Sequence, residues 1–390
     1  MDLTQLSPEK RNLFDQFANN VADCRLPEYT THAHLIKWLI AREFDLAKSE
    51  AMFRQSLEWR QINQVDKILD KWTPPEVLTK YYALGATGHD KFNCPVWVNA
   101  FGRTDMTGIL QSVTKRDYLR YMVYITEMSH RLMMENALRS GKPVSYQTLI
   151  IDMADFSVNQ MSKQFMDIGM ETTNLFVTNY PEGVRRVFVI NVPQVFSVGF
   201  NLVKPFLSAA TLAKLRIFSH DAKAWKEALL EEIDADQLPA HYGGTMTDPD
   251  GNPFCLTKIN MGGEVPKSYY INNKKPESGA SGAQHLKSEL VPAGNRKQIE
   301  IVVDEAKSLM RWEFMTEDGD VGFQINCVKK DDGKEVIVLP RARVDSHQMM
   351  EAGEIVCIYS GTYVIEFDNS YSYFRPKKLW YSIEVTKSES

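Results

Sequence analysis

The sequence lacks the features that mark a membrane-spanning or a secreted chain. No run of about 20 apolar residues occurs in its 390 residues, so no segment is long enough to cross a bilayer. The N-terminus, MDLTQLSPEKRN, has no apolar core of a signal peptide. The five cysteines are odd in number and form no CxxC pair, which favours a reduced, intracellular protein. We therefore expect a cytoplasmic protein, which would meet any lipid from the water side.

Motifs of the common enzyme classes are also absent. There is no GxSxG, no GxxxxGK[ST] and no HExxH, which argues against a lipid hydrolase, a nucleotidase and a metalloprotease. His32 and His34 are two residues apart and point to different sides of a helix, which is poor metal geometry. Asp152 and Asp155 could form a carboxylate pair after an apolar strand, but capping of the next helix explains them more simply. We expect no catalytic residue, no cofactor and no metal.

An excess of positive charge is missing as well. The formal net charge is −5 and the isoelectric point is near 6.0, whereas a general nucleic-acid binder is usually basic over a whole domain. The composition, 44% hydrophobic and 24% charged, is that of a folded globular protein. At this length the chain exceeds one ordinary core, so we expect two or three domains and no nucleic-acid partner.

The chain reads as a helical segment followed by alternating strands and helices. Residues 1–75 predict an all-α bundle, with Ser7 and Asp45 as helix N-caps. Residues 76–250 predict an α/β domain with a mostly parallel sheet, because long crossovers separate its short apolar runs. The expected strands lie at 96–98, 149–151, 187–190 and 215–218, and the expected helices at 114–139 and 159–180.

The C-terminal third has a different pattern. Residues 251–297 are turn-rich and predict a linker that contains an early strand. Residues 298–387 hold seven short alternating runs with Gly and Asp-Gly turns between them, which predicts an antiparallel β-sandwich. The fold class is therefore multidomain: an N-terminal all-α bundle, an α/β domain and a C-terminal β-sandwich.

The segment 195–207, VFSVGFNLVKPFL, has two apolar stripes where an ordinary surface helix has one. A helix buried on two sides explains this pattern, and so does a lid that covers a cavity with one stripe and offers the other to a membrane or a partner. Pro205 and Gly199 are weak points that suit a hinged gate. The candidate gate and pocket residues are Phe196, Phe200, Val203 and Leu207 in one stripe, and Val195, Val198, Leu202 and Phe206 in the other.

Several motifs in a fixed order carry a resemblance to a known family. They are Tyr180-Pro181-Glu182, VINVP at 189–193, KPFL at 204–207 and LPAHYGG at 238–244, with WLIAREFD at 38–45 upstream. Together with GTMTDPDGNP at 244–253 and FDNSYS at 367–372, they resemble the CRAL-TRIO lipid-binding family, in the subgroup that carries a C-terminal GOLD domain. The resemblance implies a lipid cavity closed by a mobile helix, and ligands such as phospholipid, squalene or tocopherol that are exchanged with membranes.

The resemblance also implies candidate lipid head-group residues. Arg42, Glu182 and Lys214 match positions that hold the inositol phosphate in phosphatidylinositol-transferring members, although structural salt bridges explain them equally well. Glu43 stands where the family usually has a lysine, and Gln147 and Leu149 stand where inositol-binding members have hydroxyl residues. These departures favour a neutral hydrophobic lipid.

Two functions follow from this interpretation. The first is a carrier that binds a neutral isoprenoid or a phospholipid in a gated cavity and exchanges it with membranes, without making or breaking a bond. The second is a lipid-regulated adaptor, in which the GOLD domain binds a protein partner in membrane trafficking.

Overall fold

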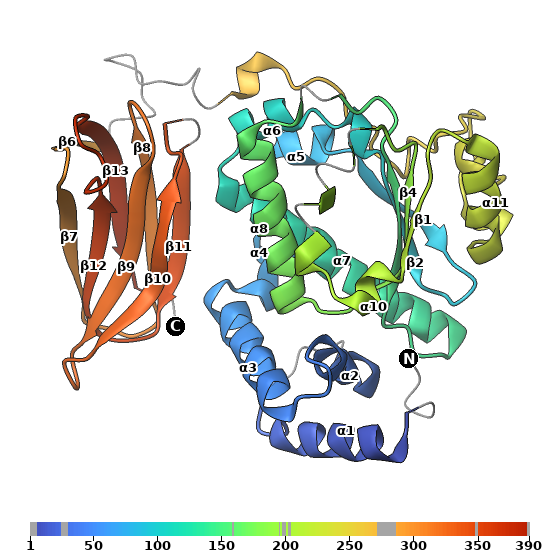
Figure 1. The fold of residues 1–390 in the computed structure, drawn as a ribbon, viewed down its shortest axis with the longest axis horizontal. Helices are drawn as coiled ribbons and strands as arrows, with labels where there is room; N and C mark the ends of the chain where they lie inside the picture. Colours follow the sequence, from blue (N-terminus) through green and yellow to red (C-terminus); the bar gives the residue numbers. More distant parts are fainter. Residues whose placement is uncertain are drawn as a thin grey trace. The chain divides into compact units, whose positions relative to one another are not determined.

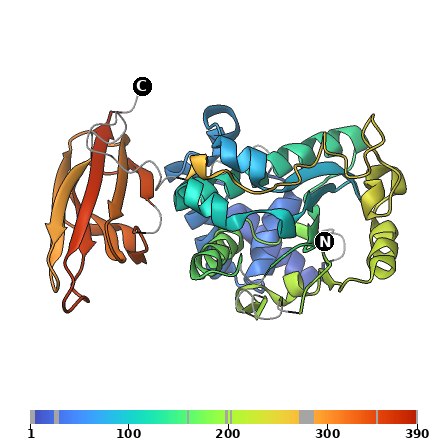
Figure 2. The same cartoon turned by 90° about the horizontal axis from the view of Figure 1, so that it is seen from above.

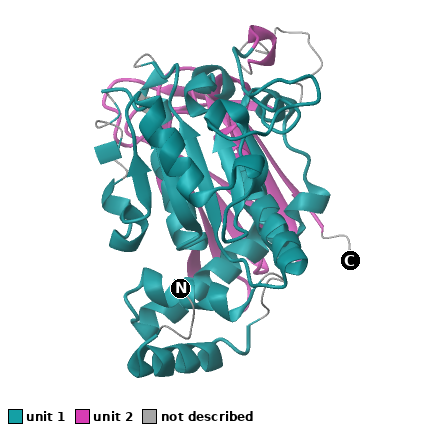
Figure 3. Cartoon of the chain, turned by 90° about the vertical axis from the view of Figure 1, so that its right-hand side faces the viewer, with its two compact units in different colours: residues 1–109, 119–265 teal, residues 110–118, 266–390 magenta. Residues whose placement is uncertain are grey.

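The computed structural model describes residues 6–24, 30–157, 160–194, 196, 200–201, 204–270, 286–347 and 350–387. The chain divides into two compact units, residues 1–109 with 119–265 and residues 110–118 with 266–390, which Figure 3 shows in different colours. Each unit has its own sheet structure and its own core, as the sequence predicts for an α/β domain and a β-sandwich.

The first unit begins with helices that pack on one another. They are α1 (Pro8–Asn20), α2 (His32–Ala41), α3 (Leu46–Ile62), α4 (Ile68–Lys71) and α5 (Glu76–Tyr81). Ser7 caps α1 by accepting a hydrogen bond from the N–H of Lys10 at 3.3 Å, and Asp45 caps α3 through the N–H of Lys48 at 3.0 Å. Both N-caps are confirmed. The core between α1, α2 and α3 contains Phe14, Phe17, Val21, Leu35, Ile36, Leu39 and Phe53.

The sheet of the first unit has five strands in the order β1-β2-β3-β4-β5 (Figure 1). They are β1 (Leu84–His89), β2 (Pro95–Asn99), β3 (Gln147–Asp152), β4 (Val184–Ile190) and β5 (Leu215–Ile217). Strands β2 to β5 pair in parallel, and they coincide with the four predicted runs. The edge strand β1 pairs antiparallel with β2 and is not predicted, because its sequence, LGATGH, has neither an apolar run nor strict alternation.

Helices cover both faces of this sheet. They are α6 (Met106–Ser112), α7 (Lys115–Ser140), α8 (Lys163–Asn179), α10 (Ala209–Leu212) and α11 (Ala222–Glu232). In Figure 1, α11 lies on one face, and α7 and α8 lie on the other. Thr114 accepts a hydrogen bond from the N–H of Asp117 at 3.0 Å at the start of α7, and Gly141 follows the end of that helix with φ of +65°. The predicted helix at 114–139 is confirmed, and α8 lies within the second predicted helix.

The pleat divides the residues of each central strand between two environments. Ile150 and Phe188 point towards α11, where they join Trp225, Leu229 and other fully buried side chains in one core. Their neighbours in sequence point to the opposite face, because successive side chains of a strand alternate. That opposite face forms the candidate site.

The second unit is a sandwich of two four-stranded antiparallel sheets, seen from above in Figure 2. One sheet has the order β10-β9-β12-β7 and the other β11-β8-β13-β6. The strands are β6 (Lys287–Val291), β7 (Arg296–Val303), β8 (Ser308–Thr316), β9 (Val321–Lys329), β10 (Glu335–Val344), β11 (Glu351–Cys357), β12 (Gly361–Asp368) and β13 (Lys377–Thr386). Rings of Phe314, Phe323 and Phe367 meet in its core with centroids 4.6 to 5.4 Å apart. The predicted sandwich is confirmed.

Candidate functional site

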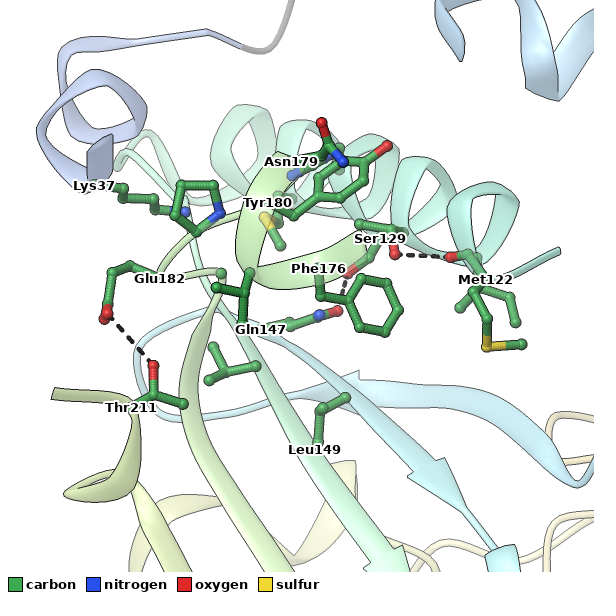
Figure 4. A pocket seen from close by; sticks show the side chains of 18 of the residues that line it. Lys37, Met122, Ser129, Gln147, Leu149, Phe176, Asn179, Tyr180, Glu182 and Thr211 are labelled. Atoms are coloured by element: carbon green, nitrogen blue, oxygen red, sulfur yellow. Dashed lines mark hydrogen bonds between the residues drawn. The ribbon is translucent and has the colours of Figure 1, made fainter. Parts of the chain in front are cut away.

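A cavity of about 380 Å³ lies over one face of the five-stranded sheet (Figure 4). Its floor follows the strand register: Trp97 pairs with Leu149, Leu149 with Val187, and Val187 with Leu215. This row of four apolar side chains crosses β2 to β5 and lines the cavity throughout. A floor of this composition replaces water with apolar surface, which is what an aliphatic or isoprenoid chain requires.

The walls come from helices on that face and from the N-terminal helices. Met122, Ile125 and Met133 of α7 contribute, as do Phe176 and Val177 of α8 and Trp38, Phe53 and Leu57 of α2 and α3. Methionine is flexible and adapts to apolar contents of irregular shape. The cavity is thus enclosed by elements from 30 to 215 in the chain, which all belong to the first unit.

Polar side chains on the floor are bonded to one another. The indole N–H of Trp97 donates to Ser129 Oγ at 3.1 Å, and Ser129 donates to Gln147 Oε1 at 2.5 Å. These bonds occupy polar groups that an inositol ring would otherwise contact. Leu149, next to Gln147 on the same face of β3, offers no hydrogen bond at all.

Lys37 is the unexpected polar residue of the cavity. It lies in α2, it is 4% exposed, and its Nζ donates to the carbonyl oxygen of Ser145 and lies 4.5 Å from the ring centroid of Tyr146. Burial, with a smaller contribution from the charge of Lys214, lowers the pKa of Lys37 to about 7. The cavity therefore contains an amine that can be neutral near physiological pH.

Two buried histidines lie close to Lys37. His34 and His130 both line the cavity, and their rings meet edge to face at 6.0 Å. Burial is the main reason that the pKa of His34 falls to about 3, and it lowers the pKa of His130 well below its ordinary value. Both imidazoles are therefore neutral at physiological pH and add no charge to this part of the cavity.

Glu182 holds together the segment that follows the predicted gate. Its Oε1 accepts from Ser208 at 2.7 Å and from Thr211 at 3.4 Å, and its Oε2 accepts from Lys214 at 2.6 Å. Burial by itself would raise the pKa of Glu182, but the hydrogen bond and the charge of Lys214 outweigh it, and the pKa lies below its ordinary value. Glu182 is thus an anion that ties residues 208–214 to the start of β4.

Asp152 has the corresponding role before the predicted gate. It accepts hydrogen bonds from Asn191 Nδ2 at 2.7 Å, from the N–H of Ala154 at 3.0 Å and from Tyr242 Oη at 3.2 Å. Both Asn191 and Glu182 have a left-handed backbone, with φ of +55° and +52°. Asp152 therefore stabilises a turn instead of capping a helix, and Asp155 forms a separate ion pair with Arg103 at 3.2 Å.

Half of the candidate gate residues can be placed. Val195, Val198, Leu202 and Val203 lie outside the described residues. Phe196 and Phe200 stack with ring centroids 5.6 Å apart, and Phe196 packs against the sheet residues Val187 and Val189. Leu207 lines the cavity, whereas Phe206 is 42% exposed. Phe196 and Leu207 of one stripe thus face inward, whereas Phe206, the described member of the other stripe, is partly exposed to solvent.

The structure brings two of the three head-group candidates together. Glu182 and Lys214 form the ion pair above, and Glu182 lines the cavity. Arg42 ends α2, where its guanidinium donates to the carbonyl oxygen of Ala41 at 3.2 Å, and it does not line the cavity. Lys37 is the cationic residue of α2 that does, and sequence reasoning missed it. The available signal was a lysine inside the apolar run of residues 35–40.

A second buried ion pair ties the N-terminal helices to the sheet domain. Arg60 of α3 donates to Glu127 of α7 at 2.8 Å, and Tyr180 donates to the same carboxylate oxygen at 2.6 Å. Arg60 also contacts Asp66 at 2.6 Å. These contacts fix α3 against α7 and α8, which are two walls of the cavity.

Comparison with known proteins assigns both units. Residues 79–244 match the family model of the CRAL/TRIO domain, and residues 324–386 match the model described as Golgi-dynamics membrane-trafficking, the GOLD domain. The chain therefore contains a CRAL/TRIO domain in its first unit and a GOLD domain in its second. The resemblance noted in the sequence is confirmed.

The chain is also similar to individual proteins, over different shares of its length. Protein ctg-1 of Caenorhabditis elegans is 29% identical over 358 residues, which cover 90% of this chain and 91% of that protein. Among solved structures, that of Sfh5 covers 64% of this chain and 90% of its own, with a TM-score of 0.49 and 18% identity. In the part of the chain that the structure describes, no helix is both long and apolar enough to span a bilayer.

Proposed function

We propose that this protein is a carrier that takes a hydrophobic lipid into the cavity of its first unit and exchanges it with membranes. The observation that carries the proposal is the apolar row of Trp97, Leu149, Val187 and Leu215 on the cavity floor. Each methylene that moves from water into such a site contributes about 0.8 kcal/mol. A neutral isoprenoid suits this cavity better than a phosphoinositide, since Leu149 offers an inositol hydroxyl no partner. No bond of the lipid is made or broken.

The gate is part of the same proposal. Buried carboxylates anchor the described residues on either side of the proposed gate: Asp152 accepts a hydrogen bond from Asn191 before it, and Glu182 accepts one from Ser208 after it. Leu207 on the inner side and Phe206 on the outer side support a lid with one stripe towards cargo and one towards a bilayer. In this proposal, Glu182 and Lys214 hold the end of the lid when no polar head group competes for them.

Each domain has its own role in this proposal. Residues 76–250 hold the cargo, the helices of residues 1–75 complete the walls, and residues 298–387 form the GOLD domain. The carrier acts in the cytoplasm and visits intracellular membranes transiently. An adaptor that uses the GOLD domain to bind a trafficking protein is the second candidate, and the match of residues 324–386 is the observation that favours it.

Cargo binding can be tested by measuring lipid loading of the wild type and of a variant whose cavity is blocked by a larger side chain. The full chain is incubated with phosphatidylcholine vesicles that contain α-tocopherol, squalene and phosphatidylinositol, recovered, and analysed by native mass spectrometry. The wild type should retain a neutral lipid. Leu149→Trp should retain at least tenfold less because the indole occupies the cavity, and Leu138→Trp, on the exposed side of α7, should behave like the wild type. No lipid on the wild type, or equal loading of a folded Leu149→Trp variant, would contradict the carrier.

A further inference from the structure

The most exposed large apolar side chains of the described chain are two neighbours in the sandwich. Tyr373 is 89% exposed and Phe374 is 92% exposed, and their ring centroids are 6.4 Å apart. Both lie in the loop of residues 369–376 between β12 and β13. Exposing two adjacent aromatic rings to water is unfavourable, so the pair calls for an explanation that the cavity does not provide.

Hydrogen bonds hold the loop at its base. Asn369 is fully buried, and its side-chain amide donates to the carbonyl oxygens of Val291, Pro292 and Arg375 at 3.0 to 3.2 Å. Ser372 Oγ donates to the same carbonyl of Arg375 at 3.0 Å. A clamped loop loses little conformational entropy when its tip enters another phase.

The surroundings of the pair are amphipathic. Arg375 is exposed directly beside Phe374, and within the described ranges of the chain it forms no ion pair. Lys378 is exposed two residues after the loop, and it pairs in register with Leu290 of β6, which is itself an exposed apolar residue. Apolar tips and cations thus share one end of the sandwich, which is the arrangement that an interfacial membrane contact uses.

Acidic groups limit what net charge can contribute at this end. The N–H of Glu317 donates to the carbonyl oxygen of Lys378 at 3.0 Å, and Asp318 follows it in the β8–β9 turn. Asp320, also close by, is bonded to Arg343 and Lys377. This end is therefore not a cationic patch, and insertion of the rings, not attraction to anionic lipid, has to supply the affinity.

We propose that the loop of residues 369–376 is a membrane-docking tip, in which Tyr373 and Phe374 insert into the interface of a phospholipid bilayer while Arg375 pairs with a lipid phosphate. A bilayer accepts a small protruding tip, whereas a stable protein partner needs a contact area of about 800 Å² on each side. The phenol of Tyr373 can remain among the head groups while the ring of Phe374 reaches the acyl chains. The docking site goes beyond the carrier function, since it holds whether or not the cavity binds lipid.

Vesicle flotation of the full chain tests the tip. Phosphatidylcholine vesicles, with and without phosphatidylserine, should bind the wild type, and the double variant Tyr373→Ser, Phe374→Ser should bind at least tenfold more weakly. The matched control is Val302→Ser, Ile337→Ser, which removes two apolar side chains that are 66% and 68% exposed elsewhere on the sandwich. The control should bind like the wild type. Equal binding of the wild type and the Tyr373, Phe374 variant overturns the proposal.

A second measurement reports insertion itself. In a Phe374→Trp variant, indole emission should shift to the blue with vesicles and should be quenched by lipids brominated in the acyl chains. Emission that is not quenched would place the loop outside the bilayer and refute docking. Docking would also be refuted if the double variant Tyr373→Ser, Phe374→Ser floated with the vesicles like the wild type but no longer bound a defined protein partner. Neutral-lipid loading measured by native mass spectrometry should be unchanged in every variant of the tip, so failure of the docking site and failure of the carrier are distinguished.

Discussion

The buried amine of Lys37 should make the stability of the first unit depend on pH in a specific direction. In an unfolded chain its pKa returns to about 10.5, against about 7 when folded. The unfolded state therefore binds more protons between these values, and the free energy of unfolding rises with pH across that range. Below about pH 7 the lysine is charged in both states and the folded protein bears the full cost of burying it.

The size of this cost follows from the shift. At 1.36 kcal/mol per pKa unit, the fall of the Lys37 pKa from 10.5 to about 7 corresponds to at most about 5 kcal/mol below pH 7. Lys37→Met keeps the length of the side chain and removes the charge, but it leaves the carbonyl oxygen of Ser145 without that donor, at a cost of about 1–3 kcal/mol. The variant should therefore be more stable than the wild type by about 2–4 kcal/mol at about pH 6.5. The difference should fall by about 3 kcal/mol by about pH 9.5.

Urea denaturation followed by the helical circular dichroism signal measures this difference, because the helices lie almost entirely in the first unit. Comparing two proteins at each pH cancels the titration of the groups that do not interact with Lys37. Lys142→Met removes an exposed lysine and should show no pH-dependent difference from the wild type. A Lys37→Met variant that differs from the wild type by the same amount at every pH would show that Lys37 does not titrate as a buried amine, and the reasoning would be wrong.

Three further predictions concern the gate and the buried ion pairs. Phe206→Asp should slow lipid transfer between vesicles about tenfold without lowering the free energy of unfolding by more than about 0.5 kcal/mol, since the ring is exposed; a normal transfer rate would remove Phe206 from the gate. Arg60→Met should cost about 3–5 kcal/mol in urea denaturation because it leaves Glu127 buried without its cation, and adding Glu127→Gln should recover part of that loss. Glu182→Gln should weaken the hold on Lys214 and speed lipid release about tenfold in a stopped-flow dequenching assay; an unaltered release rate would separate this ion pair from gating.

Strands β2 to β5 could be predicted because burial on both faces leaves a short apolar run in the sequence. The edge strand β1 could not, because it is defined by close approach: a Cβ on Gly85 would lie 2.1 Å from the carbonyl oxygen of Lys258. Gly85 is required by the backbone of a residue more than 170 positions later in the chain, but from the local sequence alone it resembles a turn residue. Tertiary contact, not local preference, determines this strand.

Some residues of the candidate site could likewise be predicted from the sequence, and others could not. Glu182 and Lys214 could be suspected from the motifs around them, but the contacts of Glu182 with Ser208, Thr211 and Lys214 arise only when the start of β4 meets α10 and the residues after it. Lys37 could not be assigned to the cavity, because a lysine in an amphipathic helix usually extends its amine to solvent. In the folded chain the amine of Lys37 is buried by residues that are distant in sequence, and the residues next to Lys37 give no sign of them.

The alternation along β3 has a consequence for how this protein can change. Gln147, Leu149 and Ile151 face the cavity, whereas Thr148 and Ile150 face the core against α11 and nearby polar partners. The lining of the cavity and the packing of the core are thus encoded at interleaved positions of one strand. Selection can therefore alter the shape of the cavity, one odd-numbered residue at a time, while the even-numbered residues keep the scaffold intact, and a designer can use the same independence to fit the cavity to a chosen lipid.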